Sequence, residues 1–211
     1  LALPVALIAS TFAVFGAMLG LYLSALNPDI IQVCLGVTIT GIALLLLMAK
    51  NTEMPEVRKQ DAIGLALGLS GTYWEQGTKQ EVTWKTHRTL PGLLMFVVIG
   101  ILAGMFGLGA GWANVPVLNL VMGVPLKVSV ATSKFLLSIT DTSAAWIYMN
   151  RGCVFPLIAV PSIVGLMLGS LVGVKVLSRA KPKFIRYVVI GVLFFAGLKA
   201  IDKGLGLGLL G

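Results

Sequence analysis

Two charged residues lie in the middle of one apolar stretch. Lys134 and Asp141 are seven residues apart within residues 125–149, with Ser138 between them. In a helix this spacing places both on one face, about two turns apart. A charge inside a lipid bilayer is costly unless it is paired or hydrated, so such residues are functional candidates. They could form a structural ion pair or part of a substrate site, and the spacing does not separate these alternatives.

A second unusual stretch, GMFGLGAGWANVPVLNLVMG, covers residues 104–123. Glycine permits tight turns, and Pro116 cannot donate a hydrogen bond to the preceding helical turn, so we expect a broken helix. Such backbone is tolerated at membrane depth only where protein or a water-filled cavity satisfies it. The new helix N-terminus, near Trp112 to Pro116, would present free N–H groups and a partial positive charge, which favour an anion.

Helix packing is the alternative explanation for the glycines. Small residues spaced four apart form close contacts between membrane helices. Packing does not account for Asn114, Pro116 and Asn119, which follow the glycines closely. Interrupted helices are associated with transport sites, and we therefore favour the broken helix.

The composition indicates a polytopic membrane protein. The chain is 57% hydrophobic and 11% charged, with a mean hydropathy of +0.97, whereas soluble domains are about 25% charged. Its apolar runs are continuous, unlike the alternating strands of a β-barrel. The net charge of +8 comes from Lys and Arg residues in short loops between apolar segments, as in membrane proteins. This placement argues against nucleic-acid binding. Neither a catalytic constellation nor metal-ligand spacing occurs, so we expect no enzyme, cofactor or metal site.

Six apolar runs are long enough to predict membrane helices. They cover residues 1–26, 28–49, 91–106, 125–149, 154–178 and 183–201. Residues 107–124 are short for a span, so we expect residues 91–106 and this segment together to form a re-entrant hairpin or a pair of short, broken spans. The polar stretch over residues 51–90 and the loop over residues 175–186 are rich in Lys and Arg, which predicts that both are cytoplasmic.

Two segments resemble each other and suggest a repeat. Residues 16–37, GAMLGLYLSALNPDIIQVCLGV, are similar to residues 165–192, GLMLGSLVGVKVLSRAKPKFIRYVVIGV. The first contains a turn without cations and the second a basic turn, so the copies are predicted to cross the membrane in opposite directions, as in many transporters. The predicted fold class is an all-α transmembrane helix bundle with inverted repeats and a broken or re-entrant Gly/Pro segment.

The repeat also predicts the domain organisation. Residues 1–50 form the helix pair of the first repeat, residues 51–90 a cytoplasmic loop, and residues 91–211 the second half with the broken helix. The counterpart of residues 91–153 would precede residue 1, and the sequence does not begin with Met. We expect either a piece of a longer chain or a protein that has lost half of its repeat.

The segment GMFGLGAGWANVPVLNLVMGVPLKVSVATSKFLLSITDTSAAWIYMNRG, residues 104–152, resembles the TauE/SafE sulfite exporters, also called the TSUP or DUF81 family. The shared features are a glycine-rich turn, a V-P-x-L stretch, G-V-P, A-T-S and a closing Tyr-x-x-x-G. The polar loop is also similar to that of some members. The resemblance implies an inner-membrane transporter of small anions, often sulfur-containing ones such as sulfite, thiosulfate or sulfonates.

The resemblance and the pattern together give the candidate substrate site. Backbone N–H groups would come from residues 107–116, hydroxyls from Thr132 and Ser133, and positive charge from Lys134, with the two halves rocking about the site. The candidate substrate-binding residues are Gly107, Gly109, Gly111, Asn114, Pro116, Asn119, Thr132, Ser133, Lys134 and Asp141.

Several positions depart from the family pattern and keep a second interpretation open. Ala110 interrupts the glycines, Asn114 stands where Lys is frequent, Lys134 stands where Asn is usual, and Asp141 replaces a small residue. The alternative is a degenerate family member that serves as a structural or accessory subunit of a larger membrane complex. The expected partners are the lipid bilayer and a small anion, with a homo-oligomer or a membrane complex as further options.

Overall fold

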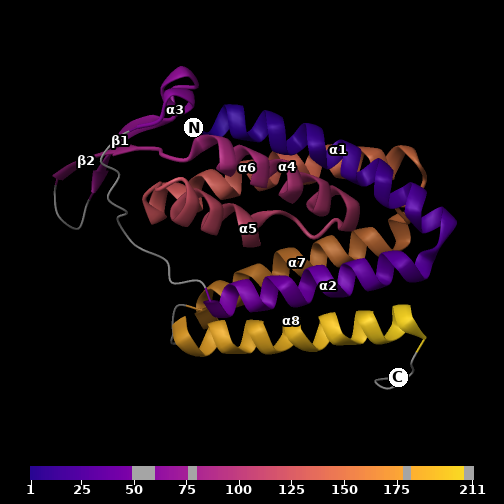
Figure 1. The fold of residues 1–211 in the computed structure, drawn as a ribbon. Helices are drawn as coiled ribbons and strands as arrows, with labels where there is room; N and C mark the ends of the chain where they lie inside the picture. Colours follow the sequence, from indigo (N-terminus) through magenta and orange to yellow (C-terminus); the bar gives the residue numbers. More distant parts are fainter. Residues whose placement is uncertain (49–59, 76–79, 178–181, 207–211) are drawn as a thin grey trace. The chain divides into compact units, whose positions relative to one another are not determined.

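Helices make up most of the computed structural model, which describes residues 1–48, 60–75, 80–177 and 182–206 (Figure 1). The elements are α1 (Ala2–Leu26), α2 (Pro28–Met48), α3 (Ala62–Ala66), β1 (Ser70–Glu75), β2 (Gln80–Lys85), α4 (Thr89–Phe106), α5 (Gly111–Pro116), the π-helical turn η1 (Val117–Val121), α6 (Leu126–Asn150), α7 (Pro156–Leu177) and α8 (Pro182–Leu205). The predicted all-α membrane bundle is confirmed, and each of the six long helices begins and ends within a few residues of its predicted bounds.

Three helices in the described part of the chain are long and apolar enough to cross a membrane. They are α1, α4 and residues 156–173 of α7, and residues 28–44 of α2 form a shorter apolar helix. Helix α6 is less apolar because it carries Lys127, Lys134, Asp141 and a series of hydroxyl residues. Residues 51–59 and 178–181, which belong to the two loops predicted to be cytoplasmic, lie outside the described residues.

The contacts divide the chain into two compact units. The first contains residues 1–22 and 49–145, and the second contains residues 23–48 and 146–211. This division follows spatial contacts, whereas the three predicted domains follow the repeat, and the domain assignment stays a prediction. All the candidate site residues belong to the first unit.

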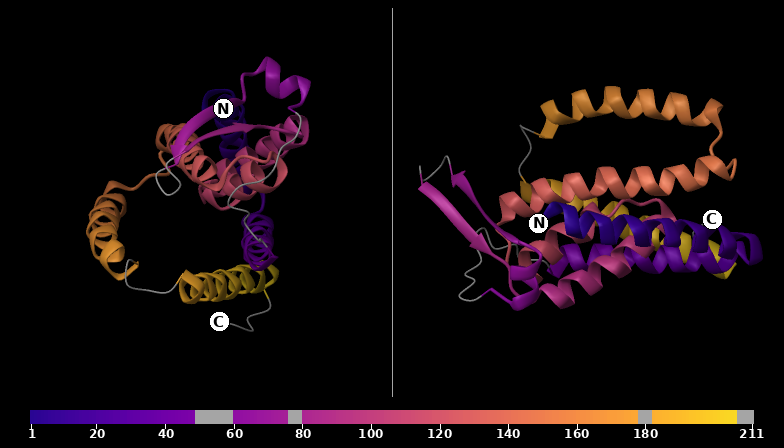
Figure 2. Two further views of the ribbon diagram at one scale, coloured as in Figure 1. Left: turned by 90° about the vertical axis from the view of Figure 1, so that its left-hand side faces the viewer. Right: turned by 90° about the horizontal axis from the view of Figure 1, so that it is seen from above.

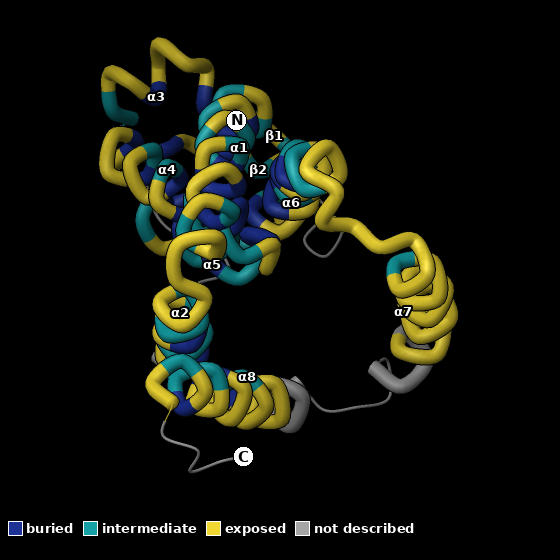
Figure 3. The backbone as a smooth tube through the Cα atoms, turned by 90° about the vertical axis from the view of Figure 1, so that its right-hand side faces the viewer, coloured by how far each residue is buried: buried dark blue, intermediate teal, exposed yellow. Residues whose placement is uncertain are grey.

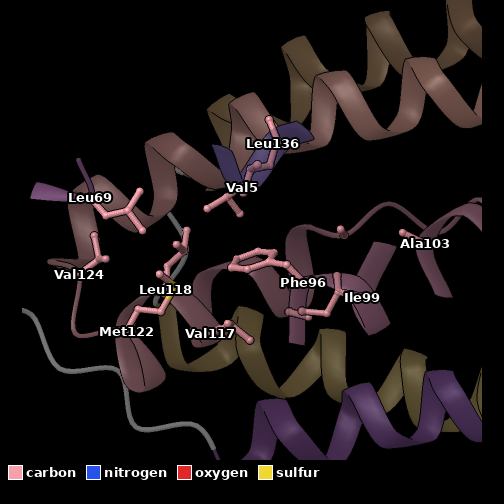
Figure 4. Packing of buried hydrophobic residues seen from close by; sticks show 13 residues of the cluster. Val5, Leu69, Phe96, Ile99, Ala103, Val117, Leu118, Met122, Val124 and Leu136 are labelled. Atoms are coloured by element: carbon pink, nitrogen blue, oxygen red, sulfur yellow. The ribbon is translucent and has the colours of Figure 1, made fainter. Parts of the chain in front are cut away.

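The core of the first unit lies where α1, α4, η1 and α6 meet (Figure 4). Phe96 is fully buried at its centre, and Val5, Leu118 and Leu136 are equally enclosed. Glycines bring α1 and α4 together: a methyl group on Gly20 would lie 2.6 Å from the Met105 carbonyl oxygen. Small residues therefore set the distance between these two helices.

The polar segment before α4 contains a short helix and an antiparallel hairpin, which the sequence pattern did not predict. In the hairpin Ser70 pairs with Lys85, and Glu75 pairs with Gln80. Leu69 is fully buried and Trp84 packs against the core, so the hairpin is attached to the bundle. Asp61, just before α3, also links the polar segment to α4: it accepts hydrogen bonds from the Thr89 backbone N–H (2.8 Å) and the Thr89 hydroxyl (2.7 Å).

The second unit contains the close helix pair α2 and α8, which lie side by side (Figure 2). A methyl group on Gly36 would lie 2.7 Å from the Gly197 carbonyl oxygen, so these backbones almost touch. Among the residues of α7 whose burial is described, all but the half-buried Ala159 are exposed (Figure 3). A methyl group on its Gly165, Gly169 or Gly173 would have no neighbour within 4 Å among the described residues.

Candidate functional site

The predicted interruption begins where α4 ends. Gly107 adopts a left-handed conformation with φ 63°, and its N–H donates to the Ala103 carbonyl oxygen at 2.8 Å. Gly109 is also left-handed, with φ 66°. Only glycine adopts such angles without strain, so these two residues turn the chain out of α4 and into α5.

Pro116 does not break the helix, which corrects the role expected for it. The chain remains helical through Pro116 and then widens into η1, where the Met122 N–H donates to the Val117 carbonyl oxygen at 3.0 Å. A proline ring inside a helix clashes with the preceding turn and removes one hydrogen bond. A wider π turn accommodates this defect, so the helix continues.

The glycine turn, which we define as residues 107–111, packs directly on α6. A methyl group on Gly109 would lie 3.2 Å from Leu137 Cδ1 and 3.3 Å from Asp141 Oδ2. At Gly111 the corresponding distances are 3.2 Å to Leu137 Cδ1 and 4.0 Å to Ser133 Oγ. The turn therefore faces a strip of α6 that carries a hydroxyl, a methyl group and a carboxylate in succession.

Most hydroxyls on α6 are already used within the helix. Ser129, Ser138, Thr140, Thr142 and Ser143 each donate to a backbone carbonyl oxygen three to five residues earlier. This is the usual behaviour of Ser and Thr in helices.

Thr132 and Ser133 differ from their neighbours. Both side chains are buried, at 7% and 4% exposure, and neither hydroxyl has a hydrogen bond within the described residues. Neither oxygen is among the fully buried polar atoms that lack a partner, so both hydroxyls keep some access to the surroundings. These two hydroxyls are therefore available to a ligand or to water.

The two asparagines near the turn have different environments. Asn119 donates from Nδ2 to the Val124 carbonyl oxygen at 2.9 Å, which fixes the segment before α6. Asn114 is fully buried, and its Oδ1 and Nδ2 atoms both lack a hydrogen-bond partner among the described residues. Burying an amide without partners is costly, so Asn114 is a stronger candidate for ligand contact than Asn119.

Sequence reasoning missed one side chain at this site. The Trp112 Nε1 atom is buried without a partner in the described structure, although the indole packs against the core. In α5 it is two residues from Asn114, so the two side chains do not point the same way. The position of a tryptophan immediately after a glycine turn was visible in the sequence, but its unpaired N–H was not.

Lys134 and Asp141 do not form the ion pair that was one of the alternatives. Within the described residues neither has an ion pair or a hydrogen bond, and both side chains are exposed. Asp141 lies against Gly109, whereas Lys134 is not among the nearest neighbours of Gly109 or Gly111. The structural ion-pair interpretation is therefore wrong.

The sequence matches the family model described as "Sulfite exporter TauE/SafE" over residues 1–200. The chain belongs to the TauE/SafE family. The family resemblance inferred from the glycine turn and its following motifs is thereby confirmed. Groups of three or more His, Cys, Asp or Glu side chains suited to a metal ion are absent from the described part of this family member.

Two relatives of the chain carry transporter names. It is 29% identical to "Probable membrane transporter protein YunE" of Bacillus subtilis (strain 168) over 192 residues, which are 90% of this chain and 67% of the relative. It is 28% identical to "Probable membrane transporter protein MJ0441" of Methanocaldococcus jannaschii over 117 residues, 51% of this chain and 43% of the relative. No solved structure matches the chain. The family and these relatives support a multi-pass membrane transporter.

Proposed function

We propose that this chain transports small sulfur-containing oxyanions and binds them between the glycine turn and α6. The observation that carries the proposal is that Thr132 and Ser133 are buried residues whose hydroxyls form no hydrogen bond within the described residues, whereas the other hydroxyls named above on α6 are bonded. Ser133 Oγ faces Gly111 at the start of α5. An oxyanion accepts hydrogen bonds from hydroxyl donors, so an anion at the turn would give the Ser133 hydroxyl a partner.

The surrounding groups add donors and charge. The amide of Asn114 supplies a further N–H donor, and residues 108–110 of the glycine turn lie outside α4 and α5. Lys134 follows Ser133 directly and supplies positive charge on the same helix. In this proposal Gly107, Gly109 and Pro116 shape the turn, and Asn119 supports it.

The direct test is transport by the purified chain in proteoliposomes. We expect uptake of radiolabelled thiosulfate, with competition by sulfite and by a small sulfonate. Ser133→Ala removes one donor to a charged ligand and should weaken the apparent affinity by roughly tenfold or more, because such hydrogen bonds contribute about 1.5–3 kcal/mol.

The matched control for Ser133→Ala is Thr142→Ala on the same helix. Thr142 is exposed and its hydroxyl donates to the Ser138 carbonyl oxygen at 2.6 Å, so its loss should leave the affinity unchanged. If folded wild-type protein moves none of these anions, the transport proposal is wrong. Co-purification of a stable membrane partner would then favour the accessory-subunit alternative.

A further inference from the structure

Asp141 is the single acidic residue between Thr89 and Ala145. The other charged side chains in this range are Lys127 and Lys134, both on α6. One oxygen of the Asp141 carboxylate lies 3.3 Å from the position of a methyl group on Gly109, so the carboxylate borders the glycine turn. It has no hydrogen bond or ion pair within the described residues. An ionised carboxylate within a membrane requires water or a counter-charge, so Asp141 is a candidate for a functional role.

The elements of the first unit that surround α6 offer no counter-charge to Asp141. The glycine turn, α4, α5 and η1 contain no titratable side chain, and residues 1–22 contain only Tyr22. On α6 itself Lys134 precedes Asp141 by seven residues and Tyr148 follows by seven. Asp141 is exposed at the surface of the first unit, so the protein itself does not enclose the carboxylate.

We propose that Asp141 binds a proton together with the transported anion and thereby couples anion transport to proton transport. This inference rests on the proposed function. The carboxylate and the Ser133 hydroxyl lie beside the same short turn, next to Gly109 and Gly111 respectively. An anion bound there is repelled by an ionised Asp141, and protonation removes the repulsion. Binding of the proton and binding of the anion therefore strengthen each other by the same factor.

The proton balance of this cycle is simple. A proton from water on one side of the membrane bonds to a carboxylate oxygen of Asp141 and gives the neutral acid. The anion then binds, and after the site opens to the other side both the anion and the proton leave, which regenerates the carboxylate. One proton therefore accompanies each anion. A lone carboxylate is sufficient for a proton, whereas a metal cation requires several oxygen ligands.

Thiosulfate is the suitable probe because it remains a dianion across the working pH range. In proteoliposomes with an internal pH-sensitive dye, inward thiosulfate transport by the wild type should acidify the lumen. Its apparent affinity should weaken by about tenfold per pH unit above the pKa of the carboxyl group, as expected for one linked proton. Asp141→Asn should abolish the acidification and give thiosulfate binding that does not vary with pH, measured by ligand-induced thermal stabilisation.

Two further variants exclude trivial explanations. Asp141→Glu keeps a titratable carboxyl group and should retain acidification and pH dependence. Asp29→Asn removes an exposed carboxylate at the start of α2 and should behave as the wild type. Both should elute as folded particles in detergent, like the wild type.

The inference and the proposed function fail on different results. Thiosulfate transport without acidification, acidification that survives in Asp141→Asn, or an absolute requirement for sodium ions overturns the role of Asp141 and leaves anion transport intact. Folded wild-type protein that neither binds nor moves thiosulfate, sulfite or sulfonate overturns both.

Discussion

At the scale of single residues, Asp61, which lies just before α3, links the polar segment to the start of α4 through Thr89. Burial raises the cost of its charge, but hydrogen bonds from the Thr89 hydroxyl and backbone N–H, and from backbone N–H groups at Asp61 and Gly64, outweigh that cost. The pKa of the Asp61 carboxyl therefore lies below its ordinary value. Because the folded pKa is lowered, the stabilisation is present above the unfolded pKa and is lost as the pH falls through the folded pKa.

Asp61→Ala should lower the thermal stability of the protein in detergent at neutral pH. The loss should amount to about 1 kcal/mol, as for other side chains that cap the first N–H groups of a helix. The difference from the wild type should shrink as the pH falls through the folded pKa of Asp61. Glu81→Ala, an exposed acid on β2, should have a small effect throughout. A difference between Asp61→Ala and wild type that persists unchanged in acid would contradict this account.

The sequence identified the polar residues of the candidate site but not their hydrogen-bond partners. Sequence identified Thr132, Ser133 and Asn114 as polar groups in an apolar segment. It could not show that these three lack partners among the described residues while Ser129, Thr140 and Asn119 have them, because partners depend on side-chain geometry. The seven-residue spacing of Lys134 and Asp141 permitted an ion pair, but spacing alone does not bring two charges into contact.

At the scale of elements, glycine contacts decide how closely helices approach. On α8 a methyl group at Gly197 would overlap the Thr40 hydroxyl and lie 3.0 Å from the Thr40 backbone nitrogen, whereas Gly191 has no neighbour within 4 Å. The two glycines are therefore a matched pair on one helix. One contacts α2 and the other does not.

Gly197→Ala should reduce the apparent melting temperature in detergent. We expect a loss of about 1–3 kcal/mol, typical of overpacking in a close contact. Gly191→Ala should be neutral or slightly stabilising because Ala is the better helix former. Equal melting temperatures for the two variants would argue against close packing of α2 and α8.

Prediction of the elements succeeded where one physical requirement dominates. The need for roughly 20 apolar residues per span defined the long helices, and the left-handed Gly107 and Gly109 lie where the interruption was expected. The hairpin was missed because each strand is six residues long and lies within a polar segment. The role of Pro116 was predicted wrongly because the rule that proline interrupts a helix does not consider that the helix can continue through a wider turn.

At the scale of the whole molecule, the charge distribution predicts the orientation in the membrane. Lys85 in the hairpin is exposed and belongs to the basic segment predicted to be cytoplasmic, whereas Asn27 lies in the turn without cations that is predicted to be outside. The opposite orientation of the two repeat copies stays a prediction, because it depends on which side of the membrane each of these turns occupies.

Cysteine labelling measures this orientation. In a background with Cys34 and Cys153 replaced by Ala, Asn27→Cys should react with an impermeant maleimide in intact cells. Lys85→Cys should react only in inverted vesicles or permeabilised cells. The native cysteines must be removed first because both are exposed. The reverse labelling pattern would place the hairpin outside the cell.

The wide turn after Pro116 has a consequence for chain length. A π turn holds one residue more than an α-helix uses for the same advance along its axis. A homologous chain one residue shorter between Pro116 and Gly123 can therefore retain both flanking segments by tightening this turn to ordinary pitch. We therefore expect an alignment of related sequences to show single-residue gaps confined to this stretch.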